Sequence, residues 1–409
     1  MRLKIVIPFL MLMIFSRISH KNHHLAATEY AGIFASSASV PPRQIPVVLQ
    51  PNKTRYLFVI TTDGLRWQEV YGGVDSILLR NTDYVKDTAW YKQTYWHRDA
   101  NRRREKLMPF FWNHLSKNGQ LYGNRYAGNY VNTANRMWFS YPGYNELFSG
   151  SPDDGHIFSN SKWTNPNENV FEFLNKTAEY NGKIAAFATW DVFSAIFREK
   201  KSGVNVQCGG ETTCEKTKEQ GIQQFGNRQI PPDFHTWTTA ISYIKNDHPS
   251  ISFIGLDDTD SRAHEGHYDQ YIDAAHRFDH WLSEFWDFIQ NDSLYRNQTT
   301  LLLSTDHGRG QGKHWTSHGM LVSGSDAIWI AALGPDTPAF GEVKQPMQLY
   351  QKQVAQTIAQ LLGHTFYTDR DVAPAIESVF QKPAEGSKSD QPLVQACISS
   401  KPIPVLIKK

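Results

Sequence analysis

The chain has 409 residues, which is enough for one large α/β domain or for two or three domains of average size. Its composition, 40% hydrophobic and 13% aromatic, is typical of a globular protein with a sizeable core. The formal net charge of +2 argues against binding to polyanions by bulk electrostatics, so we expect no binding to duplex nucleic acid. The one dense basic run, residues 101–104, is interpreted as a solvated helix face.

The N-terminus predicts export. A charged start, Met1 to Lys4, precedes an apolar stretch from Ile5 to Phe15 that is too short to span a membrane comfortably. We therefore predict a signal peptide over residues 1–20 and a secreted or periplasmic protein. Arg17 interrupts the expected cleavage region, so a retained N-terminal anchor is the alternative, and we expect membrane association only in that case.

The rest of the chain divides into three parts. Residues 21–54 are rich in His, Ala, Ser and Pro without apolar periodicity, and they are predicted to form a linker. Residues 55–380 are predicted to form one large folded domain, with inserted loops at about 70–105 and 198–232. Residues 381–409 are predicted to form a C-terminal tail.

Short apolar runs alternate with longer amphipathic ones in the predicted domain. The runs that predict strands are 56–62, 183–188, 250–256, 300–304 and 327–333. The runs that predict helices are 108–118, 169–180, 235–246, 268–290 and 348–362. This alternation predicts a three-layer α/β/α fold around a central, mostly parallel sheet.

Three cysteines give a limited prediction about disulfides. Cys208 and Cys214 flank a turn-rich loop that favours a bond between them in an exported protein. Two free thiols are the alternative, and Cys397 has no partner in either case.

Carboxylates and histidines, which are ligands of divalent metal ions, follow three of the predicted strands. They are Asp63, Asp260, His264, Asp306 and His307, and His318 follows shortly afterwards. In open α/β sheets, ligands bind beyond the carboxyl ends of the strands. The sequence therefore predicts a two-metal hydrolytic site at that edge.

The spacing within two of these motifs supports a shared site. Asp260 and His264 are four residues apart, so one helical turn would place both on the same face. In the Asp306-His307-Gly308 motif, adjacent side chains at a strand end point apart, and the glycine allows a close turn of the backbone.

Two candidate residues also have common structural roles. Asp63 precedes Gly64, and such a pair favours a simple turn. Ser140 precedes a predicted helix and is interpreted either as its N-cap or as a nucleophile whose hydroxyl loses its proton on coordination to a metal.

The order of these motifs resembles the alkaline phosphatase superfamily, and within it the type I phosphodiesterase/nucleotide pyrophosphatase-like branch. In that branch a strand-end Asp precedes a Thr or Ser nucleophile near a proline, then Asp-x-x-x-His, Asp-His-Gly and a final His. The matching residues, within 55–333, are Asp63, Ser140 with Pro142, Asp260 with His264, Asp306 with His307, and His318.

The resemblance implies an alkaline phosphatase-like fold and two Zn²⁺ ions. One ion would be held by Asp63, Ser140, Asp306 and His307, and the other by Asp260, His264 and His318. Ser140 would attack a small-molecule phosphate ester and form a phosphoseryl intermediate. Asn160 resembles the phosphate-contacting Asn of the family, with an ordinary exposed loop residue as the alternative.

The chain departs from the pattern of the branch in two places. Where the family has Thr-Phe-Pro-Asn, this chain has Ser140-Tyr141-Pro142-Gly143. The final His commonly lies far downstream in the branch, whereas His318 is close to the Asp-His-Gly motif. The competing histidines for the last ligand position are His314 and His364.

The predicted function is a zinc-dependent phosphoric ester hydrolase, either a phosphodiesterase or a phosphomonoesterase. A sulfatase is an alternative, although the segment after Ser140 lacks the Arg of the sulfatase motif. A non-catalytic exported binding protein on the same fold is another. Trp190, Phe193 and Phe197 are predicted to pack in the core, with stacking on a substrate as their alternative role.

Overall fold

The computed structural model describes residues 52–209 and 231–380, all of which belong to a unit spanning residues 50–409. The predicted signal or anchor at 1–20, most of the linker at 21–54 and the tail at 381–409 lie outside the described residues. Cys208 is described, and its thiol donates to the carbonyl oxygen of Asp191 at 3.4 Å. Cys214 and Cys397 lie outside the described residues, so the predicted disulfide stays a prediction.

Two sheets are present among the described residues. The larger contains β1 (Tyr56–Thr62), β2 (Gln120–Tyr122), β4 (Ile184–Ala188), β5 (Asn205–Cys208), β6 (Ile251–Leu256), β7 (Thr299–Ser304), β9 (Ile330–Leu333) and β10 (Gly341–Glu342). Their spatial order is β10-β2-β9-β7-β1-β6-β4-β5, and among them only β9 runs antiparallel to its neighbours. The smaller sheet contains β3 (Asn129–Asn132), β8 (Ala327–Ile328) and β11 (Met347–Tyr350).

Helices connect and cover the strands of the larger sheet. They are α1 (Trp67–Gly72), α2 (Thr88–Tyr95), α3 (Ala100–Leu107), α4 (Ser116–Asn118), α5 (Ser140–Ser149), α6 (Val170–Asn175), α7 (Phe193–Ile196), α8 (Glu199–Ser202), α10 (Pro232–Asp247), α11 (Asp258–His264), α12 (Tyr268–Asn291) and α13 (Gln353–Leu361). Short 3-10 turns lie at Leu78–Arg80, Arg125–Ala127, Gly312–His314 and Glu377–Val379, and a π-helical turn lies at Phe111–Leu115.

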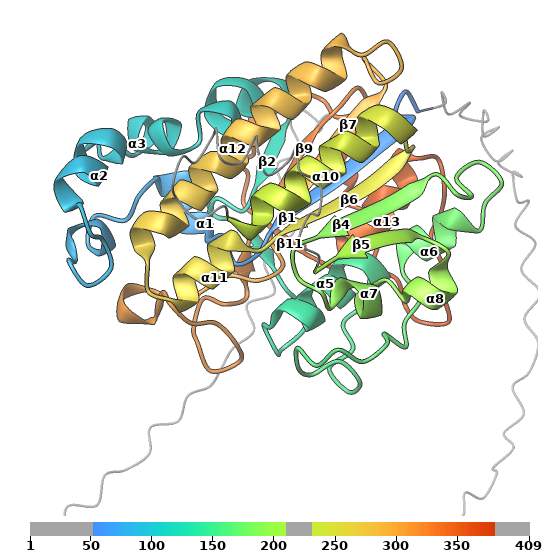
Figure 1. Cartoon of the computed structure of the whole chain (residues 1–409), viewed down its shortest axis with the longest axis horizontal. Coiled ribbons are helices and arrows are strands. Elements are labelled where there is room, and N and C mark those ends of the chain that lie inside the picture. Colours follow the sequence, from blue (N-terminus) through green and yellow to red (C-terminus); the bar gives the residue numbers. More distant parts are fainter. Residues whose placement is uncertain (1–51, 210–230, 381–409) are drawn as a thin grey trace, which may run out of the picture. The chain divides into compact units, whose positions relative to one another are not determined.

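The central sheet is buried on both faces, which confirms the predicted three-layer fold. Successive side chains of a strand point to opposite faces, so Phe58 and Ile60 of β1 enter one core while Leu57 and Val59 enter the other. Figure 1 shows α10 and α12 over one face, with α5, α6 and α13 on the other side of the sheet. Burial on both faces is why these strands are continuous apolar runs in the sequence.

The structure corrects several predicted boundaries. The run 327–333 is two strands in different sheets, because the chain changes sheets at Trp329, whose indole donates to the carbonyl of Leu65 at 2.9 Å. The predicted helix 108–118 is confirmed as helical over residues 109–118, with a π-helical turn at Phe111–Leu115 inside it. The predicted helix 348–362 begins only at Gln353, because β11 precedes it.

The segment 70–105 is largely helical, although it was predicted to be an inserted loop. Asp87 accepts a hydrogen bond from the amide of Trp90 at the start of α2, and Asp99 caps α3 through the amide of Asn101. Such N-caps offset the cost of unpaired amides in a first turn, so both helices are stabilised locally despite their polar composition.

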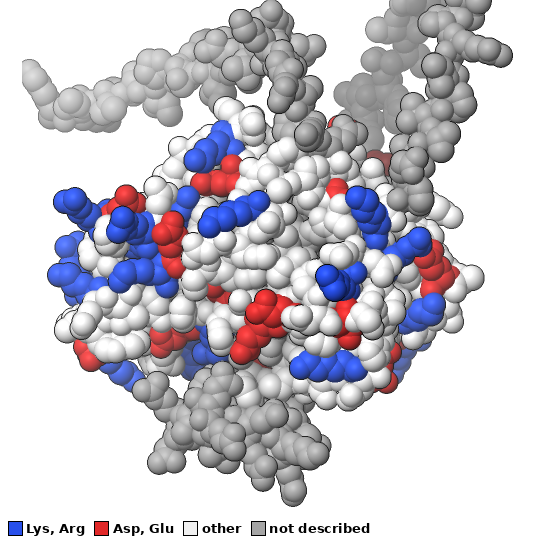
Figure 2. Space-filling model, turned by 90° about the horizontal axis from the view of Figure 1, so that it is seen from above, with Lys and Arg blue, Asp and Glu red and all other residues white. Residues whose placement is uncertain are grey.

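The basic run 101–104 has structural contacts as well as charge. Figure 2 shows Lys and Arg side chains gathered at the end of the molecule where α2 and α3 lie. Arg103 stacks over Trp96 at 4.6 Å and Arg104 over Trp112 at 3.4 Å, and Arg104 also pairs with Glu342. Much of the run therefore anchors α3 to its surroundings.

Within the described ranges, none of the helices combines the length and the apolarity that a membrane crossing requires.

Candidate metal centre

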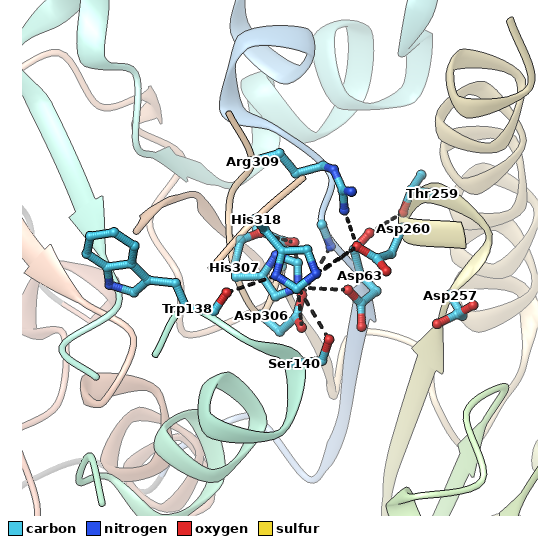
Figure 3. Close-up of polar contacts among 12 residues, drawn as sticks. Asp63, Trp138, Ser140, Asp257, Thr259, Asp260, Asp306, His307, Arg309 and His318 are labelled. Atoms are coloured by element: carbon cyan, nitrogen blue, oxygen red, sulfur yellow. Dashed lines mark hydrogen bonds and ion pairs between the residues drawn. The ribbon is translucent and has the colours of Figure 1, made fainter. Parts of the chain in front are cut away.

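The candidate site lies beyond the carboxyl ends of three adjacent strands. β1 pairs in parallel with both β6 and β7, so the three strands end at the same edge of the sheet. Asp63 follows β1, Asp306 follows β7, and α11 begins just after β6 and carries Asp260 and His264. The loop after β7 contributes His307 and His318 to the same place (Figure 3).

Three acidic or hydroxyl side chains converge on one imidazole nitrogen. Nε2 of His307 lies 3.3 Å from Ser140 Oγ, 3.3 Å from Asp63 Oδ1 and 3.4 Å from Asp306 Oδ2. All four side chains are buried. The structure therefore brings together the first set of predicted ligands, hereafter the first pocket.

The first pocket contains lone pairs without matching donors. Asp63 Oδ1 and Asp306 Oδ2 are buried and have no hydrogen-bond partner among the described residues. Nδ1 of His307 lies 2.9 Å from the carbonyl of Gly308 and donates to it, which leaves Nε2 as the ring nitrogen that faces the carboxylates. Burial, together with repulsion from Asp306 and Asp260, raises the pKa of Asp63 well above its usual value. This donor set fits a divalent cation, which would pair all three groups.

A second group of predicted ligands lies directly beside the first. Nε2 of His264 lies 3.2 Å from Asp260 Oδ2 and 3.1 Å from Nε2 of His318. Nε2 of His318 in turn lies 3.8 Å from Asp260 Oδ1. Asp260 and His264 lie one turn apart on α11, as their spacing predicted. These three residues form the second pocket. The rings of His307 and His318 stack at 3.8 Å, so the two pockets are adjacent.

The second pocket presents neutral imidazole nitrogen to a cation. Burial, with repulsion from His307, lowers the pKa of His318 to about 2. Its Nδ1 donates to the carbonyl of Trp138 at 2.9 Å, which turns Nε2 toward Asp260 and His264. A neutral, oriented imidazole is the form that binds metal ions.

Ser140 is the first residue of α5 and does not cap it. The N-cap position belongs to Phe139, and no side chain caps this helix. The Ser140 hydroxyl instead points to His307, so the capping interpretation is wrong. A Cβ on Gly143 would lie 2.5 Å from the carbonyl oxygen of Asp306, so glycine at this position lets α5 approach the end of β7 closely.

Asn160 lies at the edge of the site and is exposed. Its Oδ1 accepts the amide N–H of Tyr141 at 3.0 Å, which fixes the side chain beside the first turn of α5. With Oδ1 used in this way, the amino group of Asn160 is the part available for a ligand next to Ser140.

Arg309 is a buried member of the site that sequence reasoning missed. Its guanidinium pairs with Asp260 Oδ1 and donates to the carbonyls of Trp315 at 2.9 Å and Thr316 at 2.7 Å. Burial opposes ionisation of Asp260, yet Arg309 and His264 hold its pKa well below the usual value. The one sequence signal for this role is the position of Arg309 directly after Asp-His-Gly.

A chain of hydrogen bonds that the sequence did not reveal orients His318. Buried Glu146 accepts from the amide of Asn135 at 2.7 Å and from its side chain at 2.8 Å. Asn135 Oδ1 accepts from the amide of Trp138 at 3.0 Å. Trp138 has a φ of 53°, unusual for a non-glycine residue, and this conformation directs its carbonyl at His318 (Figure 3).

Gly64 fits closely between the two pockets. Its φ is +60°, and a Cβ there would lie 2.9 Å from both Asp260 Oδ1 and the guanidinium of Arg309. Its amide donates to Asp306 Oδ1 at 3.1 Å. Asp63 and Gly64 therefore form a turn and also belong to the site.

The competing histidines lie elsewhere. His364 lies 3.6 Å from Glu179 and contacts the ring of Tyr180, and His314 is exposed on a 3-10 turn. Phe193 and Phe197 are buried in the core, which agrees with the prediction of core packing for them.

Comparisons with known proteins identify a family and solved structures with a similar fold. A family model described as the metalloenzyme superfamily matches residues 125–363. No curated protein matches the chain in sequence.

Solved structures share the fold at low sequence identity. The 2-O GAG sulfatase BT1596 has a TM-score of 0.55 at 10% identity, over 81% of this chain and 76% of its own. The alkaline phosphatase PafA has a TM-score of 0.54 at 11% identity, over 81% of this chain and 100% of its own. The phosphonate monoester hydrolase of Agrobacterium radiobacter has a TM-score of 0.53 at 13% identity, over 82% of this chain and 78% of its own.

Proposed function

The chain belongs to the metalloenzyme superfamily, and we propose that it is a metal-dependent hydrolase of phosphoric esters with Ser140 as its nucleophile. The observation that carries this proposal is the position of the Ser140 hydroxyl. It lies 3.3 Å from His307 Nε2, in the pocket where the partnerless oxygens of Asp63 and Asp306 converge.

Two divalent ions fit the two sets of donors, and Zn²⁺ is the ion we propose. Three imidazoles among the donors favour zinc over magnesium or calcium, which prefer oxygen ligands alone. The first pocket would hold one ion through Asp63, Ser140, Asp306 and His307, and the second would hold the other through Asp260, His264 and His318. When bound, such ions lower the pKa of a coordinated hydroxyl and neutralise charge on a phosphoryl group.

The residues of the chain supply the remaining parts of the reaction. Ser140 Oγ, having lost its proton, attacks phosphorus in line with the ester oxygen, whose bond to phosphorus breaks as a phosphoseryl ester forms. Water then attacks that phosphorus from the vacated side, and the bond to Ser140 breaks. The amino group of Asn160, which is held beside the first turn of α5, would donate to a phosphoryl oxygen and favour its negative charge.

Sulfate esters are the alternative substrate class, and a non-catalytic binding protein is the alternative of another class. Against a non-catalytic binding protein, the candidate nucleophile and both sets of candidate ligands lie together at the site.

From the apolar N-terminal segment we further propose that the protein acts after export, in the periplasm or outside the cell.

A substrate panel tests the proposed function. The zinc-loaded protein is assayed with p-nitrophenyl phosphate, a methyl p-nitrophenyl diester, an aryl phosphonate monoester and p-nitrophenyl sulfate. We expect turnover of phosphoric esters, with Ser140→Ala lowering kcat by about 10³-fold or more while retaining zinc. The matched control is Ser149→Ala in the same helix, where the hydroxyl only donates to the carbonyl of Ser151. Turnover of the sulfate ester alone, or of no ester, would refute the proposal.

A further inference from the structure

Large apolar side chains are exposed on both loops that border Ser140. Phe158 and Trp163 expose 48% and 62% of their surface, and Met320 and Leu321 expose 53% and 92%. Clustered exposed apolar residues are costly and usually mark a binding surface, whereas single ones need no explanation. Figure 1 shows the two loops, green and orange, beyond the arrowheads of the central strands.

The first surface, formed by Phe158 and Trp163, is attached to the residue after the nucleophile. The two rings contact each other edge to face with centroids 6.1 Å apart. Tyr141 holds this loop twice, because its amide donates to Asn160 Oδ1 and its hydroxyl donates to the carbonyl of Trp163 at 2.6 Å. Asn160 lies between the two aromatic residues in the sequence, so the aromatic pair flanks the group proposed to contact phosphate.

The second surface, formed by Met320 and Leu321, is attached to the residue before the nucleophile. Phe139 contacts the ring of His318 edge to face at 5.8 Å. A Cβ on Gly319 would lie 2.8 Å from Phe139, so the chain from His318 to the exposed pair passes directly over that ring. Met320 and Leu321 therefore extend from the second pocket rather than from the Asn160 side.

We propose that the substrate is a phosphoric diester with an apolar organic group on each side of phosphorus. This inference rests on the proposed function and extends it from ester hydrolysis to the class of ester. In-line attack places the leaving oxygen on the side of phosphorus away from Ser140, toward the second pocket, so the leaving group contacts Met320 and Leu321. The retained group contacts Phe158 and Trp163, whose flat faces suit a ring.

The bond changes balance without any further reactant. Attack by Ser140 forms the bond from its oxygen to phosphorus, breaks one ester bond and releases the first alcohol, whose oxygen gains one proton for the one that Ser140 loses. The intermediate is then itself a diester, linking Ser140 and the retained group. Water cleaves the bond to Ser140, so the products are one alcohol and one phosphoric monoester.

Substrates with a constant leaving group test the retained side. We compare kcat/KM for p-nitrophenyl phosphate and for its methyl and phenyl diesters, using the zinc-loaded full chain. We expect kcat/KM for the phenyl diester to exceed that for the methyl diester by about tenfold, since a phenyl group is buried against the aromatic pair and stacks on it whereas a methyl group does not stack. The double variant Phe158→Ser/Trp163→Ser should bring that ratio close to one. Tyr367→Ser, at an aromatic residue exposed elsewhere, should leave the ratio unchanged.

The leaving side is tested with methyl diesters of p-nitrophenol and of the larger 4-methylumbelliferone. We expect Met320→Ser/Leu321→Ser to lower kcat/KM more for the larger leaving group, by about threefold or more. Equal losses for both, or a phenyl preference that persists without Phe158 and Trp163, would refute the apolar contacts. A wild-type preference for the monoester would refute the diester assignment while leaving the proposed function intact. Inactivity on every phosphoric ester would instead refute the proposed function.

Discussion

The carbonyl oxygen of Trp138 lies 2.9 Å from Nδ1 of His318 and accepts a hydrogen bond from its N–H. One hydrogen bond thus selects the tautomer and the ring orientation of the last candidate ligand. The backbone that carries it is held in a positive-φ conformation by Asn135, which buried Glu146 holds in turn. The second pocket therefore depends on residues that touch no metal ligand themselves.

Removal of this support is expected to weaken the second pocket selectively. Asn135→Ala deletes the acceptor for the Trp138 amide, and loss of such support typically lowers metal affinity about 10–100-fold. Trp138→Gly should retain the affinity, because glycine adopts a φ of 53° readily and keeps the carbonyl. Zinc affinity is measured by competition with a chelator. Asn181→Ala, at an exposed asparagine, is the control, and an unaltered affinity in Asn135→Ala would contradict the role assigned to the chain of hydrogen bonds.

Addition of one methyl group at Gly143 is expected to displace the proposed nucleophile. The new Cβ would meet the carbonyl oxygen of Asp306 at 2.5 Å, so α5 must move away from β7. Gly143→Ala should cost about 1–3 kcal/mol of stability and lower kcat through the shift of Ser140. Thermal unfolding and kcat are compared with those of Gly155→Ala, where a Cβ meets nothing within 4 Å. Equal behaviour of the two variants would show that the close approach has no consequence.

Metal removal is expected to destabilise the protein more at high pH than at low pH. Without metal, burial and repulsion from Asp306 raise the pKa of Asp63 above the unfolded value of 3.8. An acid with a raised folded pKa favours folding when protonated, so stability of the metal-free protein falls as pH rises from 3.8 toward that folded pKa.

The measurement is thermal unfolding with EDTA between pH 5 and pH 8, repeated for Asp63→Asn. The neutral amide cannot repel Asp306, so the variant should lose less stability over this range than the wild type. With zinc present, we expect the wild type to be the more stable of the two proteins, because Asp63→Asn lacks one of the proposed zinc ligands. Identical pH slopes for the two metal-free proteins would contradict the explanation.

Loss of the charge at Arg309 is expected to destabilise the protein at neutral pH. Arg309→Gln leaves Asp260 buried without its ion-pair partner, which typically costs about 3–5 kcal/mol. The pKa of Asp260 is depressed in the folded state, so this contribution is present above pH 3.8 and is lost as pH falls through the folded pKa. Chemical denaturation at pH 7 and at pH 3 measures the difference between wild type and variant. Arg262→Gln, which breaks a more exposed pair with Glu265, should cost only about 0–1 kcal/mol.

Much of the site was readable from the sequence because its candidate ligands lie in short local motifs. A carboxylate directly after an apolar run, as at Asp63 and Asp306, marks a strand end whatever the rest of the fold does. The four-residue spacing of Asp260 and His264 likewise needs only one helical turn. Parallel strands that end at one edge then bring such motifs together, so their order along the chain predicted both the fold and the ligand set.

The tertiary structure decided what depends on contacts between distant segments. Whether Ser140 caps α5 or faces His307 depends on how α5 packs against β7, and local sequence alone favoured the cap. Arg309 and Trp138 carry no motif of their own, because one acts through burial beside Asp260 and the other through a backbone carbonyl. The exposure of Phe158 and Trp163, in contrast to the burial of Phe193 and Phe197, is also a property of packing. Sequence thus determined the chemistry of the ligands, while the fold determined their orientation and what surrounds them, since both arise from residues far apart in the chain.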